Sequence, residues 1–258
     1  MPLDGQTQTL NRIYKDRDAQ DVLAHALTSF GDMALVSSFG AESVVLLHMA
    51  AQIDRTVPVL FIDTEMLFAE TLEYQRDVAS SLGLSNVQVN RATRDTLFER
   101  DNENLLHLHD PDACCALRKT EPLQKALAGF DGWISGRKRY QGGDRQALDL
   151  FEVDRPLGRM PSVKVNPLTR WDSSDLRDYI TAHNLPRHPL VAKGFPSVGC
   201  APCTTRVGSG ENARAGRWRN TPNRNAAFTL TTAKLPDPHN WRGQLRGLAQ
   251  RIDHDCTC

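Results

Sequence analysis

Short apolar runs alternate with amphipathic segments along most of the chain. Runs typical of buried strands occur at 33–37, 57–62, 87–89, 132–135 and 163–167. Apolar residues recur with helical spacing between and after these runs, at 21–30, from 42 onward, at 69–82 and at 173–183. Because strands that alternate with helices pair in parallel, the pattern predicts an α/β fold, with a mostly parallel sheet and helices on both faces.

The pattern changes near Asn220. From 220 to 258 the chain mixes prolines, threonines and scattered arginines without sustained periodicity, and such a stretch buries little. We therefore expect one α/β domain over 1–219 and a poorly ordered, irregular tail over 220–258. Within the domain, the polar loop at 141–146 is expected to be mobile.

Charge and cysteine content narrow the class of protein. The 31 basic and 31 acidic residues balance, so nothing global attracts nucleic acid or an anionic membrane, and an anion site must be built from local arginines. No apolar run is long enough to span a bilayer, and the N-terminus lacks the basic-then-apolar order of a signal peptide. We expect a cytoplasmic protein, whose six cysteines are metal ligands or reactive thiols rather than a disulfide framework.

A serine- and glycine-containing loop joins the first predicted strand to a helix. It reads Ser37-Ser38-Phe39-Gly40-Ala41-Glu42-Ser43. Free backbone N–H groups and the helix dipole favour an anion there, which makes the loop a candidate phosphate or sulfate cradle. An ordinary strand-to-helix turn with a serine cap explains the spacing equally well. The loop lacks the Gly-Lys-Ser/Thr ending of a Walker A motif.

Polar residues also follow the second predicted strand. Asp63 and Thr64 stand at its carboxyl end, the edge of an open α/β sheet where ligands bind. A ribose or adenine contact is one interpretation, and an aspartate that caps the next helix is the other.

Basic residues gather in two places, and guanidinium groups match phosphate and sulfate oxygens. Such runs are commonly solvated surface, but these lie in glycine-flanked turns near the predicted ligand edge. The two groups are Arg137, Lys138, Arg139 and Arg145, and Arg206, Arg214, Arg217 and Arg219.

Four cysteines form an adjacent pair, Cys114-Cys115, and a Cys-x-x-Cys pair, Cys200 and Cys203. Four thiolates held together would make a metal centre. An adjacent pair is an awkward half of a zinc tetrahedron, and the spacing also differs from ferredoxin patterns. Geometry alone therefore favours an iron–sulfur cluster only slightly, and zinc stays open.

Together these segments resemble the iron–sulfur adenylyl-sulfate (APS) reductases of assimilatory sulfate reduction, relatives of the PAPS reductases. The resemblance covers about Asp21 to Arg219 and rests on six segments in order. They are Ser-Ser-Phe-Gly-Ala-Glu at 37–42, Phe-Ile-Asp-Thr at 61–64, Cys-Cys-x-x-Arg-Lys-x-Glu-Pro-Leu at 114–123, Gly-Arg-Lys-Arg at 136–139, Pro-Ser-Val-Gly-Cys-Ala-Pro-Cys-Thr at 196–204 and Arg-Ala-Gly-Arg-Trp at 214–218.

The resemblance implies an adenine-nucleotide α-hydrolase-like fold and a 4Fe–4S cluster on the four cysteines. In this family the cluster positions and polarises the sulfate end of the substrate, with Lys119 near it, and does not pass electrons. The implied substrate-binding residues are Ser37, Ser38, Phe39, Gly40, Glu42, Ser43, Asp63, Thr64, Lys119, Arg137, Arg139, Arg214 and Arg217. The implied cluster ligands are Cys114, Cys115, Cys200 and Cys203.

The implied reaction is the reduction of APS to sulfite and AMP. A cysteine thiolate attacks the sulfur of APS, AMP leaves, and thioredoxin or glutaredoxin reduces the S-sulfocysteine to release sulfite. APS is favoured over PAPS because cluster cysteines usually accompany APS use, although a PAPS-using reductase stays open. Neither nucleic acid nor a membrane is expected as a partner, and a homo-oligomer stays open.

The chain departs from the family at the nucleophile. The family carries Glu-Cys-Gly-Ile/Leu-His shortly after Arg-Ala-Gly-Arg-Trp, whereas residues 223–229 here read Asn-Arg-Asn-Ala-Ala-Phe-Thr. One permitted back-translation of these residues, AAT CGG AAT GCG GCA TTC ACC, gives Ser-Glu-Cys-Gly-Ile-His when read from its third base. We therefore hypothesise a frameshift between Arg217 and Asn225, which also accounts for the unpatterned tail.

The catalytic residue thus stays unassigned, and alternatives remain. Cys256 or Cys258 could replace the nucleophile by folding back, although nothing around them resembles a tuned thiolate site. The chain could also be a non-catalytic nucleotide- and Fe–S-binding module, a pseudoenzyme or sensor. An ATP-using thiolation enzyme would need Gly-Gly-x-Asp-Ser, from which Phe39 and Glu42 depart.

Overall fold

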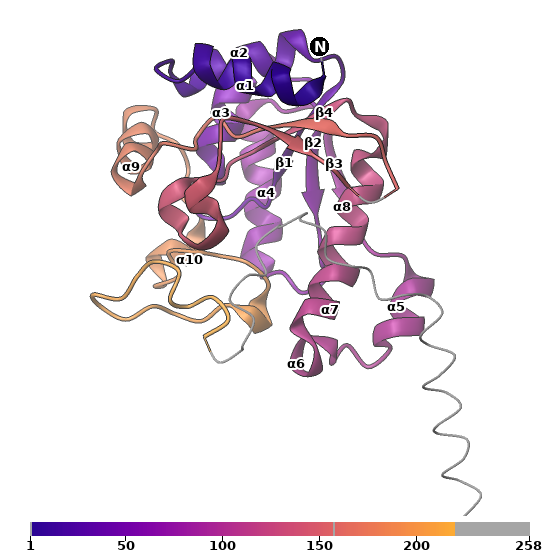
Figure 1. The fold of residues 1–258 in the computed structure, drawn as a ribbon. Helices are drawn as coiled ribbons and strands as arrows, with labels where there is room; N and C mark the ends of the chain where they lie inside the picture. The colour runs from indigo at the N-terminus through magenta and orange to yellow at the C-terminus, as the bar shows by residue number, and fades with distance from the viewer. Residues whose placement is uncertain (1, 157, 220–258) are drawn as a thin grey trace, which may run out of the picture.

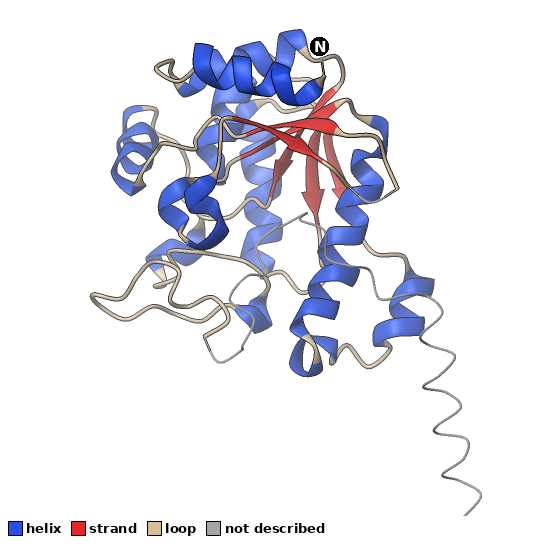
Figure 2. Cartoon of the chain, in the orientation of Figure 1, coloured by secondary structure: helices blue, strands red, loops and turns tan. Residues whose placement is uncertain are grey.

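The computed structural model describes residues 2–156 and 158–219, and the predicted tail at 220–258 lies outside these residues. A single six-stranded sheet with the order β3-β2-β1-β4-β6-β5 organises this part of the chain (Figures 1 and 2). The strands are β1 Met33–Ser37, β2 Val59–Ile62, β3 Val87–Asn90, β4 Gly132–Ser135, β5 Phe151–Asp154 and β6 Ser162–Val165.

All neighbouring strands pair in parallel except the edge strand β5, which pairs antiparallel with β6. In the central strands, alternate residues point to opposite faces, as the two-residue period of a strand requires. Leu35 and Phe61 belong to the core on one face, whereas Ala34 and Leu60 belong to the core on the other. This double burial explains why these strands are continuous apolar runs.

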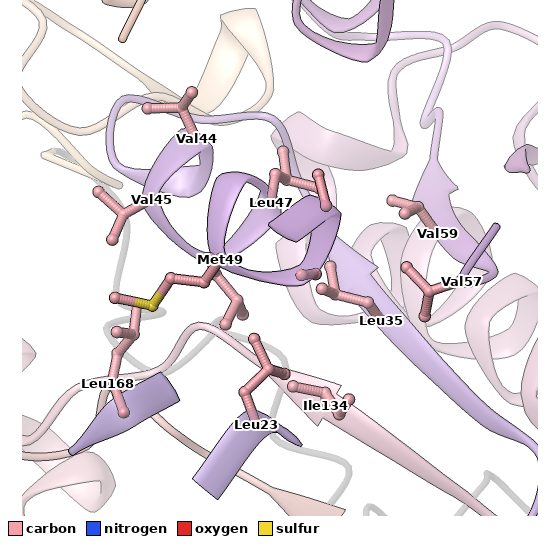
Figure 3. Close-up of a cluster of buried hydrophobic side chains, with 14 of the residues drawn as sticks. Leu23, Leu35, Val44, Val45, Leu47, Met49, Val57, Val59, Ile134 and Leu168 are labelled. Atoms are coloured by element: carbon pink, nitrogen blue, oxygen red, sulfur yellow. The ribbon is translucent and has the colours of Figure 1, made fainter. Parts of the chain in front are cut away.

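Helices cover both faces unequally. The larger core packs α2, α3, α4 and α9 against one face, and Figure 3 shows part of it around α3. The smaller core sets Leu123 and Leu127, at and just beyond α8, against Trp133 of β4. The helices are α1 Leu3–Ile13, α2 Ala19–Ser29, α3 Ser43–Ile53, α4 Ala69–Leu82, α5 Arg94–Asp101, α6 Leu106–His109, α7 Pro111–Cys115, α8 Glu121–Ala126, α9 Ser173–Ala182 and α10 Pro189–Ala192.

The predicted α/β fold, with its mostly parallel sheet and helices on both faces, is confirmed. Sequence patterning did not find α1 or β5, which lie together at the β5 edge, where Asn11 Nδ2 donates to the Phe151 carbonyl (2.8 Å). The polar loop at 141–146 lies in two short 3₁₀ turns, Arg139–Gln141 and Gly143–Ala147. Over the ranges 2–156 and 158–219, no helix is long and apolar enough to cross a bilayer.

Candidate functional site

The candidate site lies at the carboxyl ends of the parallel strands. Because β1, β2 and β4 run in the same direction, the loops that follow them meet at one edge of the sheet. A cavity of about 210 Å³ opens there, lined by the loop after β1, the end of β2, the turn after β4 and the segment 196–218. In Figure 1, α7 and the segment after α10 lie on this side of the sheet, toward which the arrows of β1, β2 and β3 point.

The loop after β1 is held by its own serines. Ser37 Oγ accepts from the Phe39 N–H (3.1 Å), and Ser43 Oγ accepts from the Gly40 N–H (3.0 Å). A Cβ on Gly40 would lie 3.3 Å from Ser38 Oγ, so a larger residue would crowd the loop. The residues of this loop that line the cavity are Ser37, Ser38, Gly40, Ala41, Glu42 and Ser43.

Phe39 anchors this loop from behind the cavity wall. It has a positive φ of 45° and is fully buried, with its ring edge-on to Phe61 at 5.3 Å between centroids. The ring fixes the loop to the larger core, and Phe39 does not line the cavity.

Glu42 is the one carboxylate on the described cavity wall, and it is already paired. Lys138 Nζ lies 2.8 Å from Glu42 Oε2, and the Tyr140 hydroxyl donates to Glu42 Oε1. Burial alone would raise the pKa of Glu42, but the charge and hydrogen bond of Lys138 and the hydroxyl of Tyr140 hold it below its usual value. The pair therefore neutralises Lys138 and gives this wall a fixed shape.

Arginines make the rest of this wall strongly cationic. Arg137, Arg145, Arg214 and Arg217 all line the cavity. Burial lowers the pKa of Arg137 and of Arg217 to about 10, and that of Arg145 to about 9. Among the described residues, Arg137 Nη2 and Arg217 Nε are buried without a hydrogen-bond partner. Buried cations with unused donors are costly, so the cavity is suited to an anionic ligand.

The remaining basic residues point elsewhere. Arg139 Nε donates to the Leu148 carbonyl (2.7 Å) and its guanidinium faces Asp149, so this residue does not line the cavity. Arg219 pairs with Glu211 at 2.7 Å, and the Arg206 guanidinium lies over the Phe195 ring.

The two polar residues after β2 have separate roles. Asp63 is buried behind the cavity, where it pairs with Arg91 (2.8 Å) and accepts from the Glu65 N–H. Thr64 does line the cavity, and its hydroxyl lies 3.2 Å from Cys200 Sγ.

The adjacent cysteines end a short helix that continues into a π-helical turn, Ala116–Thr120, and then into α8. Such turns interrupt α-helices mainly at functional sites. Arg118 of this turn is buried against Asp101, with Nη2 to Oδ2 at 2.6 Å, and donates to the Thr64 carbonyl at 3.1 Å. The helix of Cys114 and Cys115 is thereby fixed to the end of β2.

The second cysteine pair lies in a loop that is fixed to the same place. Cys200 forms a β-bridge with Leu67, and the Ala201 N–H donates to the Met66 carbonyl (2.7 Å). The Cys203 carbonyl accepts from the Trp218 N–H at 3.1 Å. Arg217 lies over the Trp218 ring, with its guanidinium carbon 4.5 Å from the ring centroid.

The structure brings the four thiols together, and all four are free. Burial, together with the nearby thiols of Cys115, Cys200 and Cys203, raises the pKa of Cys114 to about 12, although Arg118 opposes them. Lys119 and Arg217 act on the pKa of Cys115 and of Cys203 in the opposite direction to burial. Both cations line the cavity, and so does Cys200, whereas Cys114, Cys115 and Cys203 lie behind its wall.

Comparison with known proteins agrees with this arrangement. A family model for the phosphoadenosine phosphosulfate reductase domain matches residues 32–206, which include the sheet, the serine loop and both cysteine pairs. The chain belongs to this family.

Two curated relatives of this reductase-family chain are each named adenosine 5'-phosphosulfate reductase. The one from Chelativorans sp. (strain BNC1) is 43% identical over 222 residues, which are 84% of this chain and 89% of the relative. The one from Mesorhizobium japonicum is 48% identical over 187 residues, 72% of each chain. A crystal structure of the phosphoadenylyl-sulfate (PAPS) reductase from Candida auris, a phosphate complex, has a TM-score of 0.66 and 26% identity, covering 77% of this chain and 96% of that one.

Some cavity residues of this reductase-family chain were missed at the level of sequence. Tyr140 directly follows the Gly-Arg-Lys-Arg segment and could have been included as a hydroxyl next to a basic turn. Ser197 lies within the matched segment 196–204. Thr71 is inside a helix, and no local signal in the sequence distinguishes it from other helical threonines.

Proposed function

We propose that this chain is an APS reductase of assimilatory sulfate reduction that carries a 4Fe–4S cluster and releases sulfite and AMP. One observation carries the proposal: four thiols, distant in sequence, are near enough to shift one another's pKa, and one of them, Cys200, lines a cationic cavity built on a serine- and glycine-containing loop. The names of the relatives, adenosine 5'-phosphosulfate reductase, support APS as the substrate.

The donor set suits an iron–sulfur cluster. Four cysteine sulfurs are the ligand set of a 4Fe–4S centre, and Cys114, Cys115, Cys200 and Cys203 would hold it. Within the part of the chain that the structure describes, no three His, Cys, Asp or Glu side chains, these four cysteines included, are arranged to hold a metal ion, so the cluster is proposed from the type of donor. When bound, the cluster supplies a fixed charge beside the sulfate end of the substrate. Free thiols are also maintained in a reducing cytoplasm, which we propose as the compartment.

Different cavity residues bind different parts of the substrate. Ser38, Gly40 and Ser43 form the cradle beside the start of α3, where the helix dipole favours a phosphate or sulfate group. Arg137, Arg214 and Arg217 supply unused or weakly used donors for the remaining anionic oxygens, and Lys119 supplies charge beside Cys115. Ser37, Phe39 and Asp63 act indirectly, because they hold the loop and the strand end in place.

The chemical step needs a thiolate outside the described residues. A cysteine thiolate bonds to the sulfur of APS, the bond from that sulfur to the bridging oxygen breaks, and AMP leaves with both electrons of that bond. A dithiol reductant of the thioredoxin or glutaredoxin class then attacks the S-sulfocysteine, releases sulfite and becomes a disulfide. In our proposal the nucleophile belongs to the Glu-Cys-Gly-Ile-His motif that a frameshift removed.

The decisive experiment compares two chains. Anaerobically loaded protein of the printed sequence and a version restored to end in Ser-Glu-Cys-Gly-Ile-His are incubated with labelled APS, or with labelled PAPS, and thioredoxin, and released sulfite is measured. We expect turnover of APS by the restored chain alone.

The other outcomes are equally informative. Activity of the printed chain would assign the attack to Cys256 or Cys258, and preference for PAPS would correct the substrate. Nucleotide binding without turnover by either chain would favour the non-catalytic binding module, which the missing motif supports. Failure to bind nucleotide at all would refute the proposed function.

A further inference from the structure

One buried threonine on the cavity wall shares its hydroxyl with a histidine. Thr71 lies in α4, is 1% exposed and lines the cavity. Among the described residues, the partner of its hydroxyl is His188 Nε2, at 3.1 Å. Exposed and half-buried helical threonines such as Thr9 and Thr28 instead donate to the carbonyl four residues earlier, and Thr71 makes no such bond to a described residue.

The neighbouring hydrogen bond determines which partner donates. The Leu190 N–H donates to His188 Nδ1 (3.2 Å), so Nδ1 accepts and the ring proton is on Nε2. Burial lowers the pKa of His188 to about 4, and the ring is therefore neutral near pH 7. With its proton on Nε2, His188 donates to Thr71 Oγ1.

It follows that the hydrogen of the Thr71 hydroxyl needs another acceptor. A buried donor left without one is unfavourable, and few such groups persist in folded proteins. Because Thr71 lines the cavity, a cavity ligand can supply the acceptor.

The lack of charge around Thr71 indicates which part of the ligand accepts its hydrogen bond. The residues that β2 and α4 and their connection contribute to the cavity are Ile62, Thr64, Leu67 and Thr71, and none is charged. Every cation on the described cavity wall comes from the other segments, at 119, 137–145 and 214–217. The nearby ions Glu70 and Lys193 pair with each other at 2.8 Å and do not line the cavity.

We infer that Thr71 donates a hydrogen bond to an uncharged oxygen or nitrogen of the nucleoside part of the bound adenine nucleotide, and that His188 is a positioning residue that directs this hydroxyl. The inference rests on the proposed function, because it takes the ligand to be an adenine nucleotide. It assigns the part of the neutral wall around Thr71 to the nucleoside, whereas Thr64 lies beside Cys200 and the anionic groups are left to the arginines.

The test measures AMP binding by calorimetry on the cluster-loaded full chain. Thr71→Val keeps the shape and removes the hydroxyl, and it should weaken AMP binding about fivefold to tenfold, the loss of one hydrogen bond. Thr71→Ser keeps the hydroxyl and should stay within about twofold of the parent. Inorganic sulfate, measured as a competitor of AMP, should keep its affinity in both variants.

A second pair of variants tests the positioning role. The amide of His188→Gln can replace Nε2 as a donor to Thr71, whereas His188→Asn can accept from the Leu190 N–H but is too short to reach Thr71. We expect AMP affinity to fall in the asparagine variant and to be largely restored in the glutamine variant, with folding of each checked by thermal unfolding.

Each outcome separates the two proposals. If the parent binds AMP and Thr71→Val binds it equally well, the inference is wrong and the proposed function is unaffected. Equal loss of AMP and sulfate affinity would also overturn it, because the contact would then not be with the nucleoside. If the two His188 variants behave alike, His188 has no positioning role. If the parent binds no AMP, both proposals fail.

Discussion

The two cysteine pairs reach the same place by different means. Cys114 and Cys115 end α7, and the π-helical turn that follows is fixed by the buried Arg118–Asp101 ion pair. Cys200 and Cys203 lie in a loop with one 3₁₀ turn, held by a β-bridge to Leu67. Helical geometry and a buried charge pair define the first position, whereas main-chain pairing defines the second.

Thr64 contacts the supports of both cysteine pairs. Its carbonyl accepts from Arg118, behind the first pair, and its hydroxyl lies 3.2 Å from the sulfur of Cys200. The segment just after β2 therefore sets the distance between the two cysteine pairs. The comparison teaches that the edge of the sheet, rather than either cysteine pair, is the rigid support of the site.

The largest expected effect is the loss of any one of the proposed cluster ligands. Cys114→Ser and Cys200→Ser should each lower cluster occupancy at least about 100-fold, since loss of a ligand exceeds the effect of losing a supporting residue. Iron content and visible absorption after anaerobic reconstitution measure this. Cys256→Ser and Cys258→Ser serve as controls that should keep the cluster. Retention of a full cluster in Cys200→Ser would mean that the two pairs do not form one centre.

The next largest effect concerns the ion pair that supports the segment with Cys114 and Cys115. Arg118→Ala should lower the free energy of unfolding by about 3–5 kcal/mol, because it leaves Asp101 buried and unpaired. Arg100→Ala breaks the more exposed pair with Glu121 in the same region and should cost less than about 1 kcal/mol. Urea unfolding of the apoprotein compares the two. Similar costs would show that the Arg118–Asp101 pair does not hold this segment.

A smaller effect is the loss of stability at acid pH in the segment that carries Cys200 and Cys203. His188 precedes α10 on the segment that leads to Cys200, and burial lowers its pKa from 6.5 to about 4. Its contribution to stability is therefore complete above pH 6.5 and is lost as the pH falls from 6.5 through about 4, roughly 3 kcal/mol in all.

Hydrogen exchange can localise this acid effect. Protection factors, which correct each exchange rate for the intrinsic rate at that pH, should fall between pH 7 and 5 in residues 189–203 more than in 111–126, and His188→Gln should reduce the difference. An equal loss of protection in both segments would contradict a local role for His188.

Much of the fold could be predicted because the central strands are buried on both faces. Strands such as β1 and β2 are therefore unbroken apolar runs with clear ends. The edge strand β5 reads Phe-Glu-Val-Asp, with its central residues half-buried, and a short segment of this kind gives little signal. Helix α1 has few apolar residues, but these fall on one face, where Leu3 and Leu10 pack against the larger core, so its periodicity could have revealed it.

Where a motif follows a strand, several of the predicted residues do lie on the cavity wall. Ser38, Ser43, Thr64 and Arg137 all line the cavity, as residues at carboxyl ends of parallel strands should. Position at a strand end does not fix the direction of a side chain, and so Asp63 lies behind the wall. Residues such as Thr71 reach the cavity only through tertiary packing, and their roles depend on partners from distant segments.

The position of Cys200 and Cys203 along the chain has a consequence for biosynthesis. The last strand, β6, ends at Val165, so every strand of the sheet has been translated before the second pair leaves the ribosome. A cofactor that requires all four thiols can then be inserted only into a chain that has its complete sheet. Cofactor insertion would thus be a late step in maturation, and a bound cofactor would mark a chain whose sheet has been fully synthesised.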